Sequence, residues 1–240
     1  MLSVIIPCFN AASSIEARIG KLIAFLADHF PAFEVIIVDD GSADATPERL
    51  VALEKKDPRV YAVLLPENRG KGAAVAAGVE KSRGDFIVFT DADLPYDLEA
   101  IPRFVDSIRS GYDVILGSRY LAGTSIEGVE NQTIDRTLLS RVFVFLANLA
   151  LAHPVSDTQS GLKGFSRRAA LAIFSRITVF RFAFDVEAIA IAQALGLRIK
   201  ESPVSLVSQG RSTVRLARDG FEMCLDLLKI FLRYRLSLFK

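Results

Sequence analysis

The sequence predicts an α/β protein built on a mostly parallel central sheet with helices on both faces. Short apolar runs rich in β-branched residues alternate with helical patterns four times over about the first 115 residues. No internal repeat or low-complexity linker interrupts this order. Strands that are joined through helices usually lie parallel, so the alternation indicates one doubly wound sheet.

Local patterns give the elements of the first half. The expected strands cover residues 2–6, 34–38, 60–65, 86–89 and 113–116. Helices are expected at 46–56, 70–82 and 98–110, together with one capped by Ser13 or Ser14 whose apolar positions are Ile15, Ile19, Leu22, Ile23 and Leu26. The spacing of three and four residues predicts a single apolar face on that first helix.

The pattern changes after Ser118. A polar loop at 120–133 and an apolar helix at 138–152 precede a polar turn at 157–165, which leads into a short strand. Helices are then expected at 167–175, 184–195 and 214–238, with a strand at 197–203. We expect residues 1–240 to form one domain, in which the elements of the second half pack around the sheet.

Composition excludes several classes of function. A net charge of +1 in 240 residues leaves no cationic excess for a nucleic-acid backbone. Cys8 and Cys224 read as small buried hydrophobes in a reducing compartment, and with only His29 and His153 a zinc cluster is not expected. No signal peptide is expected at the N-terminus, and the apolar run at 142–152 is too short to span a bilayer.

Asp91 and Asp93 stand directly after the apolar strand 86–89. Ligands of open parallel sheets bind outside the carboxyl ends of the strands, where two alternating carboxylates can share one hard cation such as Mg²⁺ or Mn²⁺. The alternative is a pair of solvated acids before a helix, because the following residues also suit a turn. The motif alone does not decide between the two.

Gly70-Lys71-Gly72 opens an expected helix. Bare backbone N–H groups and a cation at a helix start suit phosphate oxygens, although such a segment is also a plain flexible helix start. A Walker motif would need Ser or Thr at Gly72, and the dinucleotide fingerprint would need glycine at Val75. Any nucleotide is therefore expected in another architecture.

Nine motifs together resemble a known family. In the first half they are Ser3-Val-Ile-Ile-Pro-Cys-Phe-Asn10, Val38-Asp-Asp-Gly-Ser42, Asn68-Arg-Gly-Lys-Gly72, Asp91-Ala-Asp93 and Gly117-Ser-Arg119. In the second half they are Asp157-Thr-Gln-Ser-Gly-Leu-Lys-Gly-Phe165, Phe182-Ala-Phe-Asp-Val-Glu187, Ser212-Thr-Val214 and Asp226-Leu-Leu-Lys-Ile-Phe-Leu-Arg-Tyr234. The first set resembles the inverting family 2 glycosyltransferases of GT-A fold, and the second resembles their dolichyl-phosphate glucosyltransferase branch.

The resemblance implies donor-binding roles for the first half, residues 1–118. It places the nucleoside on Pro7, Asn10, Asp39 and Asp40, with Asp39 on the base, and lines the nucleotide pocket with Arg69, Lys71 and Ala92. It implies that Asp93, helped by Asp91, holds Mg²⁺ or Mn²⁺ on the diphosphate. Related mannosyltransferases can have a polar third ligand where this chain has Pro95, so water or another residue is expected to complete the shell.

The resemblance makes residues 119–240 the acceptor half. Its acceptor is the phosphate of a polyprenyl lipid such as dolichol, an anion that attacks without losing a proton. Arg119, Arg136 and Arg141 are the candidates for gripping that phosphate, since a guanidinium binds phosphate through two N–H groups; their alternative role is surface solubility. Asp185 stands where relatives with hydroxyl acceptors keep a catalytic base; positioning or helix capping, shared with Glu187, is the alternative.

The expected activity is transfer of a hexose, with UDP-glucose the favoured donor and GDP-mannose the nearest rival. A second rival transfers to a glycan hydroxyl with Asp185 as base. A nucleotidyltransferase is disfavoured because no Gly-rich basic loop follows the first strand, and a non-catalytic binding module is disfavoured by the retained acids. The apolar helices 138–152 and 221–239, with Lys229, Arg233, Arg235 and Lys240, favour a peripheral position on the cytoplasmic face of a membrane over simple packing.

Overall fold

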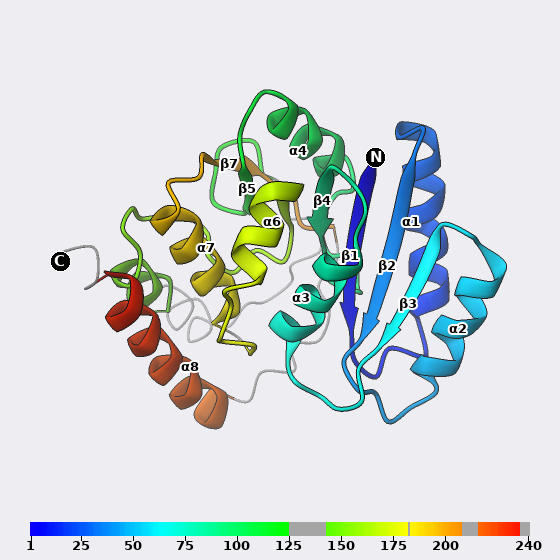
Figure 1. The fold of residues 1–240 in the computed structure, drawn as a ribbon, viewed down its shortest axis with the longest axis horizontal. Helices are drawn as coiled ribbons and strands as arrows, with labels where there is room; N and C mark the ends of the chain where they lie inside the picture. The colour runs from blue at the N-terminus through cyan, green and yellow to red at the C-terminus, as the bar shows by residue number, and fades with distance from the viewer. Residues whose placement is uncertain (125–142, 182, 208–215, 236–240) are drawn as a thin grey trace.

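The fold is a seven-stranded sheet with the strand order β3-β2-β1-β4-β6-β5-β7 (Figure 1). The structure is a computed structural model, and it describes residues 1–124, 143–181, 183–207 and 216–235. The strands are β1 Leu2–Cys8, β2 Phe33–Asp39, β3 Val60–Leu64, β4 Phe86–Phe89, β5 Val114–Ser118, β6 Lys163–Ser166 and β7 Ile199–Pro203. Only β6 runs antiparallel to its neighbours, which confirms a mostly parallel sheet.

Helices cover both faces of this sheet. They are α1 Ile15–His29, α2 Thr46–Lys56, α3 Lys71–Lys81, α4 Ala100–Arg109, α6 Arg167–Phe174, α7 Phe184–Ala194 and α8 Leu216–Ile230, and residues 143–149 are helical as well. A short π-helical turn, Phe231–Arg235, extends α8. Of the long final helix expected at 214–238, residues 214–215 and 236–238 lie outside the described ranges, as do residues 138–142 of the other apolar helix.

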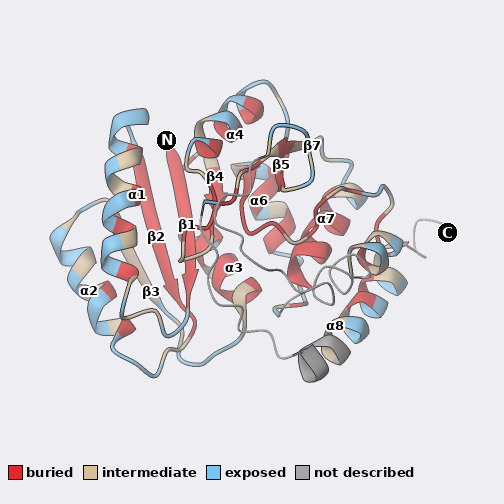
Figure 2. Cartoon of the chain, turned by 180° about the vertical axis from the view of Figure 1, so that it is seen from behind, coloured by how far each residue is buried: buried red, intermediate tan, exposed pale blue. Residues whose placement is uncertain are grey.

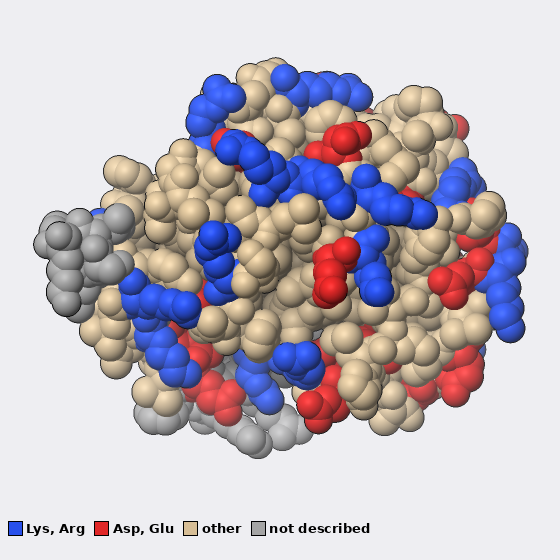
Figure 3. Space-filling view, viewed as in Figure 1, with Lys and Arg blue, Asp and Glu red and all other residues tan. Residues whose placement is uncertain are grey.

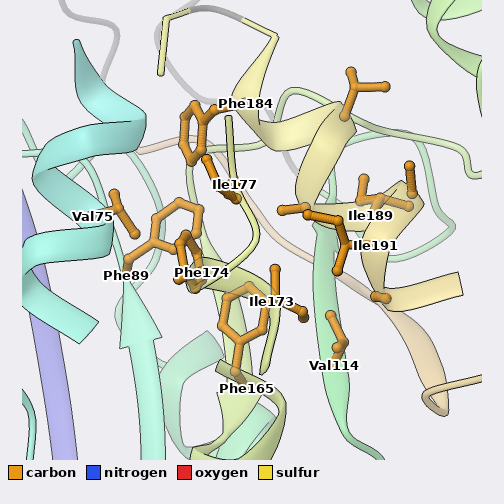
Figure 4. Close-up of a cluster of buried hydrophobic side chains, with 14 of the residues drawn as sticks. Val75, Phe89, Val114, Phe165, Ile173, Phe174, Ile177, Phe184, Ile189 and Ile191 are labelled. Atoms are coloured by element: carbon orange, nitrogen blue, oxygen red, sulfur yellow. The ribbon is translucent and has the colours of Figure 1, made fainter. Parts of the chain in front are cut away.

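Two apolar clusters form the core, one on each face. Val4 and Ile6 of β1 point to the cluster with α1, α2 and α4, whereas Ile5 points to the cluster with α3, α6 and α7. This alternation is what a strand buried on both faces requires, because successive side chains point to opposite sides. In Figure 2 the central strands are buried along their length. Figure 4 shows Phe89 and Phe184 meeting in the second cluster.

Strand β6 lies between β4 and β5, and its position determines which residues lie together at the carboxyl edge of the sheet. Because β6 is antiparallel, its first residue, Lys163, pairs with Phe89 at the carboxyl end of β4 and with Leu116 of β5. The turn before β6 therefore lies beside the acids that follow β4. The ends of β1 and β2 reach the same edge, since Cys8 pairs with Asp39.

One expectation about the cysteines is wrong. Cys8 is buried, as expected, but Cys224 is exposed on α8. Burial, and then the negative charges of Asp39, Asp44 and Asp40, raise the pKa of the Cys8 thiol to about 12. Cys8 therefore remains a neutral thiol at physiological pH, whereas the apolar surroundings of Cys224 in the sequence do not correspond to a buried position.

Candidate active site

The turns that follow β1 and β4 both contain a non-glycine residue with positive φ. Asn10 has φ 50° after β1, and Leu94 has φ 46° directly after Asp93. This left-handed conformation is tolerated by Asn but costs energy for Leu, and such strain concentrates at functional sites. The Leu94 N–H donates to the Asp91 carbonyl at 3.0 Å, which closes the turn that carries both acids.

Asp91 forms an ion pair with Lys71 from the first turn of α3. The Lys71 Nζ lies 2.5 Å from Asp91 Oδ1, and each side chain keeps about a third of its surface exposed (32% and 33%). Burial would lower the pKa of Lys71, but the charges of Asp91 and Asp185 outweigh it and raise that pKa. The ammonium thus stays charged beside the acids, where it can also attract a diphosphate.

The surroundings of Asp93 disfavour its charged form. Its pKa is raised by burial first and by the negative charge of Asp91 second. A divalent cation between these carboxylates would relieve both effects, since it replaces lost hydration and offsets the repulsion. Within the described ranges no three acid, histidine or cysteine side chains come together as a metal group. The oxygen-only pair Asp91 and Asp93 nevertheless fits Mg²⁺ or Mn²⁺, whose remaining positions water and phosphate oxygens usually fill.

The acids after β2 organise the neighbouring loops. Asp39, only 1% exposed, accepts hydrogen bonds from the backbone N–H of Ser42 at 3.0 Å and from its hydroxyl. Asp40 accepts from the backbone N–H groups of Arg69 and Gly70 at 2.9 and 2.8 Å. Its pKa is raised because burial outweighs these hydrogen bonds. A role for either acid in nucleoside binding stays a prediction.

Asn10 joins the first two strand ends. Its backbone N–H donates to Ser42 Oγ at 2.7 Å, and its Oδ1 accepts from the Ala43 N–H at 3.0 Å. Pro7 is buried at the end of β1, and Asn10 is exposed. The structure therefore brings Asn10 and Asp39, two of the expected nucleoside residues, to one loop cluster around Ser42.

The expectation of bare N–H groups at Gly70-Lys71-Gly72 is wrong for both glycines. Gly70 donates its N–H to Asp40, and Gly72 donates to the Phe180 carbonyl at 2.8 Å. Both glycines are needed because a Cβ at Gly70 would lie 2.5 Å from that same carbonyl oxygen, and one at Gly72 would lie 2.7 Å from Phe184 Cβ. The segment is thus a packing contact, and its contribution to phosphate binding rests on the Lys71 ammonium.

Arg69 lies next to this contact. Its guanidinium carbon is 5.4 Å from the centre of the Phe180 ring, a cation–π arrangement. The Arg69 residue is exposed, so the group remains open to a ligand.

The turn before β6 is buried, although its sequence is polar. Asp157, Thr158 and Ser160 are 0% exposed. Gly161 packs directly on Asp91, because a Cβ at this position would lie 1.9 Å from Asp91 Oδ2. The N–H of Gly161 donates to the hydroxyl of Tyr96 at 3.0 Å, and burial raises the pKa of that phenol. Asp91 is therefore confined by this turn on one side and by Lys71 on the other.

Arg119 follows β5 and is held by the same turn. Its Nε and Nη2 donate to the two carboxylate oxygens of Asp157 at 2.7 and 3.0 Å. Burial disfavours the charged forms of both residues, but the hydrogen bonds between them outweigh it. The pKa of Arg119 is therefore raised and that of Asp157 is lowered. Arg119 stays 26% exposed, and a guanidinium has five N–H donors, so three remain for another acceptor.

Asp185, the expected base or cap, forms a buried ion pair. Its Oδ1 accepts from the Lys163 Nζ at 2.6 Å, with side chains 6% and 0% exposed. The helix-capping alternative is wrong, because α7 has no side-chain cap and Glu187 instead accepts from the Thr178 and Val179 N–H groups at 2.8 and 2.7 Å.

The other predicted cations fall into two groups. Arg136, Arg141 and Lys240 lie outside the described residues. Three basic residues of the last helix and its π-helical extension are engaged within the protein: Lys229 pairs with Asp226 at 2.8 Å, Arg233 donates to Thr178 Oγ1 at 3.0 Å, and Arg235 donates to the Ala152 carbonyl at 3.1 Å. On the face drawn in Figure 3, Lys and Arg side chains form an arc across the upper half of the view, and Asp and Glu side chains lie beside and below it.

Four residues at this edge escaped the sequence-based reasoning: Tyr96, Asp157, Gly161 and Lys163. Three of them belong to the motif at residues 157–165, which indicates a family by its resemblance but does not indicate their contacts. The signal that could have found them is the polar composition of a segment leading straight into a buried strand, since buried polar groups need specific partners.

Residues 3–174 match the sequence profile described as Glycosyl transferase family 2. The chain belongs to this family. A family 2 glycosyltransferase fits the observed edge, where acids follow β4 and cations come from the start of α3 and from the residue after β5. The match agrees with the expected resemblance and establishes the chain as a glycosyltransferase enzyme.

Among the relatives of this family 2 glycosyltransferase is the human dolichyl-phosphate beta-glucosyltransferase, 34% identical over 247 residues that cover 97% of this chain and 75% of the human one. Dolichyl-phosphate beta-glucosyltransferase ALG5C of Trichomonas vaginalis is 33% identical over 98% of this chain and 72% of that protein. The glycosyltransferase AglD of Haloferax volcanii is 33% identical over 95% of this chain. The chain spans only 36% of AglD.

Solved structures confirm the GT-A fold. Glucosyl-3-phosphoglycerate synthase from Mycobacterium tuberculosis, crystallised with Mn²⁺, uridine-diphosphate-glucose and glycerol 3-phosphate, superposes with a TM-score of 0.67 over 97% of this chain and 79% of the synthase. The two sequences are 19% identical, so the likeness is one of fold.

Proposed function

We propose that this enzyme transfers glucose from UDP-glucose to the phosphate of a polyprenyl lipid such as dolichol, with inversion at the anomeric carbon. The observation that carries the proposal is the 34% identity over nearly the whole chain to a dolichyl-phosphate beta-glucosyltransferase. In the reaction an oxygen of the lipid phosphate forms a bond to the anomeric carbon while the bond from that carbon to the diphosphate breaks. UDP leaves with the electron pair, and an α-linked donor gives a β-linked product.

The donor binds at the carboxyl edge of β1, β2 and β4 in this proposal, within residues 1–118. Asp93 and Asp91 would hold Mg²⁺ or Mn²⁺, which supplies charge stabilisation for the departing diphosphate. Lys71 adds a fixed ammonium 2.5 Å from Asp91 and acts on the same charge. Asn10, Asp39 and their loop hold the nucleoside.

The acceptor phosphate binds from the second half, residues 119–240, at Arg119. Asp157 occupies two of the five guanidinium N–H groups, and the others face a phosphate of the lipid. Because a phosphate is already anionic at neutral pH, no general base is needed. The commitment of Asp185 to Lys163 supports a positioning role for this carboxylate.

We propose further that the enzyme lies peripherally on the cytoplasmic face of a membrane, where its lipid acceptor resides. The helices of the described ranges include none with the length and apolarity that a bilayer span requires. Two helices nevertheless carry exposed large apolar side chains: Phe145 and Leu149 at 64% and 51%, and Leu225, Leu228 and Leu232 at 43%, 53% and 53%. Leu225 and Leu228 lie on α8 and Leu232 lies on the π-helical turn that extends it, and this leucine stripe offers exposed apolar area suited to the acyl boundary.

A donor comparison tests the proposal. Purified protein, polyprenyl phosphate and Mn²⁺ are incubated with labelled UDP-glucose or labelled GDP-mannose, and label is counted in the organic phase. We expect chelator-sensitive transfer from UDP-glucose. Transfer from GDP-mannose alone would instead identify a mannosyltransferase of the same family, and label on an added glycan would identify a hydroxyl acceptor.

A further inference from the structure

The ammonium group of Lys163, the first residue of β6, is fully buried. Its side chain is 0% exposed, and its Nζ donates to the Ser160 carbonyl at 2.6 Å, to the Thr158 carbonyl at 3.3 Å and to Asp185 Oδ1 at 2.6 Å. An ammonium has three N–H groups, so all of them are used. The Phe89 ring, 5.6 Å from the Nζ, closes another side.

A buried ion pair of this kind is a weak source of stability, because the loss of hydration offsets most of the attraction. What the Lys163 bonds do provide is a fixed geometry. They join three separate segments: the start of β6, the turn at 157–161 and the first turn of α7. Since two of the three acceptors are carbonyls of the turn, the ammonium determines the path of that backbone.

The turn held by Lys163 supports both sides of the site. At its beginning, Asp157 binds Arg119 through two hydrogen bonds. At its end, Gly161 packs against Asp91, the partner of Lys71. A shift of the turn would therefore move the guanidinium on the acceptor side and the carboxylate on the donor side together.

We infer that Lys163 is a positioning residue for glycosyl transfer, which fastens the turn 157–161 to α7 through Asp185 and so sets the Arg119 guanidinium and the Asp91 carboxylate at once. The assignment of those two groups to acceptor and donor rests on the proposed function. The fastening itself rests on the contacts of Lys163. In this arrangement Asp185 serves as an anchor for the ammonium and does not meet the acceptor.

Three variants separate anchoring from direct chemistry. Lys163→Met keeps the length of the side chain but leaves Asp185 and two carbonyls without their donor. Asp185→Asn keeps an oxygen that accepts from Lys163. Glu34→Gln is the matched control, because Glu34 is 3% exposed and paired with Arg83 at 2.9 Å, but it stands at the opposite end of β2.

Amide hydrogen exchange reads out the turn without any substrate. We expect the amides of Gln159 and Gly161, which donate to Asp157 and Tyr96, to exchange at least ~10-fold faster in Lys163→Met and near the wild-type rate in Asp185→Asn and Glu34→Gln. We also expect the affinity for UDP with Mn²⁺, measured by calorimetry, to be lower in Lys163→Met and near the wild-type value in Asp185→Asn and Glu34→Gln. If Lys163→Met does not fold, Lys163→Gln, which keeps one or two N–H donors, takes its place in the comparison.

Kinetics complete the test. We expect kcat/KM to fall ~100-fold in Lys163→Met, the cost of misplaced groups, and less than ~10-fold in Asp185→Asn. The inference is overturned if Asp185→Asn loses as much activity as Lys163→Met while its turn exchanges at the wild-type rate, because Asp185 would then act on the acceptor directly. Wild-type exchange in Lys163→Met would overturn it as well. If the wild-type enzyme transfers no sugar to polyprenyl phosphate, the proposed function fails, while the exchange and UDP-binding comparisons still decide the role of Lys163.

Discussion

The Asp91 carboxylate is held between two halves of the chain: Lys71 Nζ lies 2.5 Å from its Oδ1, and the backbone of Gly161 covers its Oδ2. The first contact comes from α3 and the second from the turn before β6. Asp93, two residues later, has no such pair of contacts in the described structure, and its pKa is raised by burial and by the negative charge of Asp91. Asp91 is thus fixed by its two contacts. The surroundings of Asp93 disfavour its charged form, and a bound divalent cation would offset that energetic cost.

Adding one methyl group to Gly161 tests the contact between Gly161 and the Asp91 carboxylate. A Cβ at position 161 would lie 1.9 Å from Asp91 Oδ2, so Gly161→Ala must displace the carboxylate or the turn. We expect kcat/KM to fall by ~100-fold, as shifts of about 1 Å in a reacting group do. Gly20→Ala is the control, since a methyl group at this position on α1 would meet no atom within 4 Å. Wild-type activity in Gly161→Ala would remove Asp91 from the site.

Replacing Asp93 separates function from stability. Asp93→Ala should lower transfer by ~100-fold or more and abolish the Mn²⁺ dependence of UDP binding, because it removes the principal proposed ligand. Since burial and Asp91 disfavour the charge of Asp93, the unfolding temperature of Asp93→Asn should equal or exceed that of the wild type. Asp106→Asn, an exposed acid paired with Arg109, serves as the control. Full activity in Asp93→Ala would exclude the metal assignment.

Removing the guanidinium of Arg119 should affect the acceptor more than the donor. We expect Arg119→Ala to raise the KM for polyprenyl phosphate by ~10-fold or more, the size of one charge-assisted hydrogen bond, with a smaller change for UDP-glucose. Arg168→Ala is a control, because Arg168 also pairs with an aspartate, Asp113, at 2.8 Å but lies in the first turn of α6, beyond the far end of β6. An unchanged acceptor KM would place the phosphate elsewhere.

The Arg119–Asp157 pair should also give a pH-dependent stability. The pKa of Asp157 is lowered in the folded protein, since its bonds to Arg119 outweigh burial. The pair therefore stabilises the fold above the pKa of an unfolded Asp, near pH 4, and this contribution is lost as the pH falls through the lowered value. We expect Asp157→Asn to unfold at lower urea than wild type at pH 7, with the gap closing in acid. A gap that is constant from pH 7 to pH 3 would contradict this origin.

Flotation with vesicles tests the leucine stripe on α8. Wild-type protein should float with anionic vesicles at low salt, and the double variant Leu228→Glu, Leu232→Glu should stay at the bottom of the gradient. Leu64→Glu, an exposed leucine on the edge strand β3, should float like the wild type. If all three proteins float alike, α8 is not the contact surface.

Local patterns predicted most of the fold, because each strand and helix of the first half is encoded within its own residues. Helix α2 and strand β4 have the predicted bounds, and the carboxyl ends of β1, β2 and β4 meet as parallel topology requires. The place of β6 was not predictable in this way, since a four-residue strand does not specify its neighbours. The burial of the turn before β6 is not predictable for the same reason, because its polar composition is also typical of an exposed turn.

The partners of the charged residues could not be predicted either. Arg119 and Asp157 are 38 residues apart, and Lys163 and Asp185 are 22 apart, so only the folded sheet brings each pair together. The sequence therefore indicated which residue types matter at the edge, whereas the structure decides which of them remain available to a ligand. Asp39 and Asp40 illustrate the difference, because both accept hydrogen bonds from the loops beside them.

The most direct test of the proposed transfer is the linkage of the product. Wild-type enzyme, α-linked UDP-glucose, Mn²⁺ and a short polyprenyl phosphate are combined, and the lipid product is examined by NMR alongside the released UDP. We predict a β-linked glucosyl phosphodiester formed in equal amount to UDP, and no product with chelator or with Asp93→Ala. An α-linked product, or glucose transferred only to a hydroxyl acceptor while UDP is still released, would contradict direct displacement by the lipid phosphate.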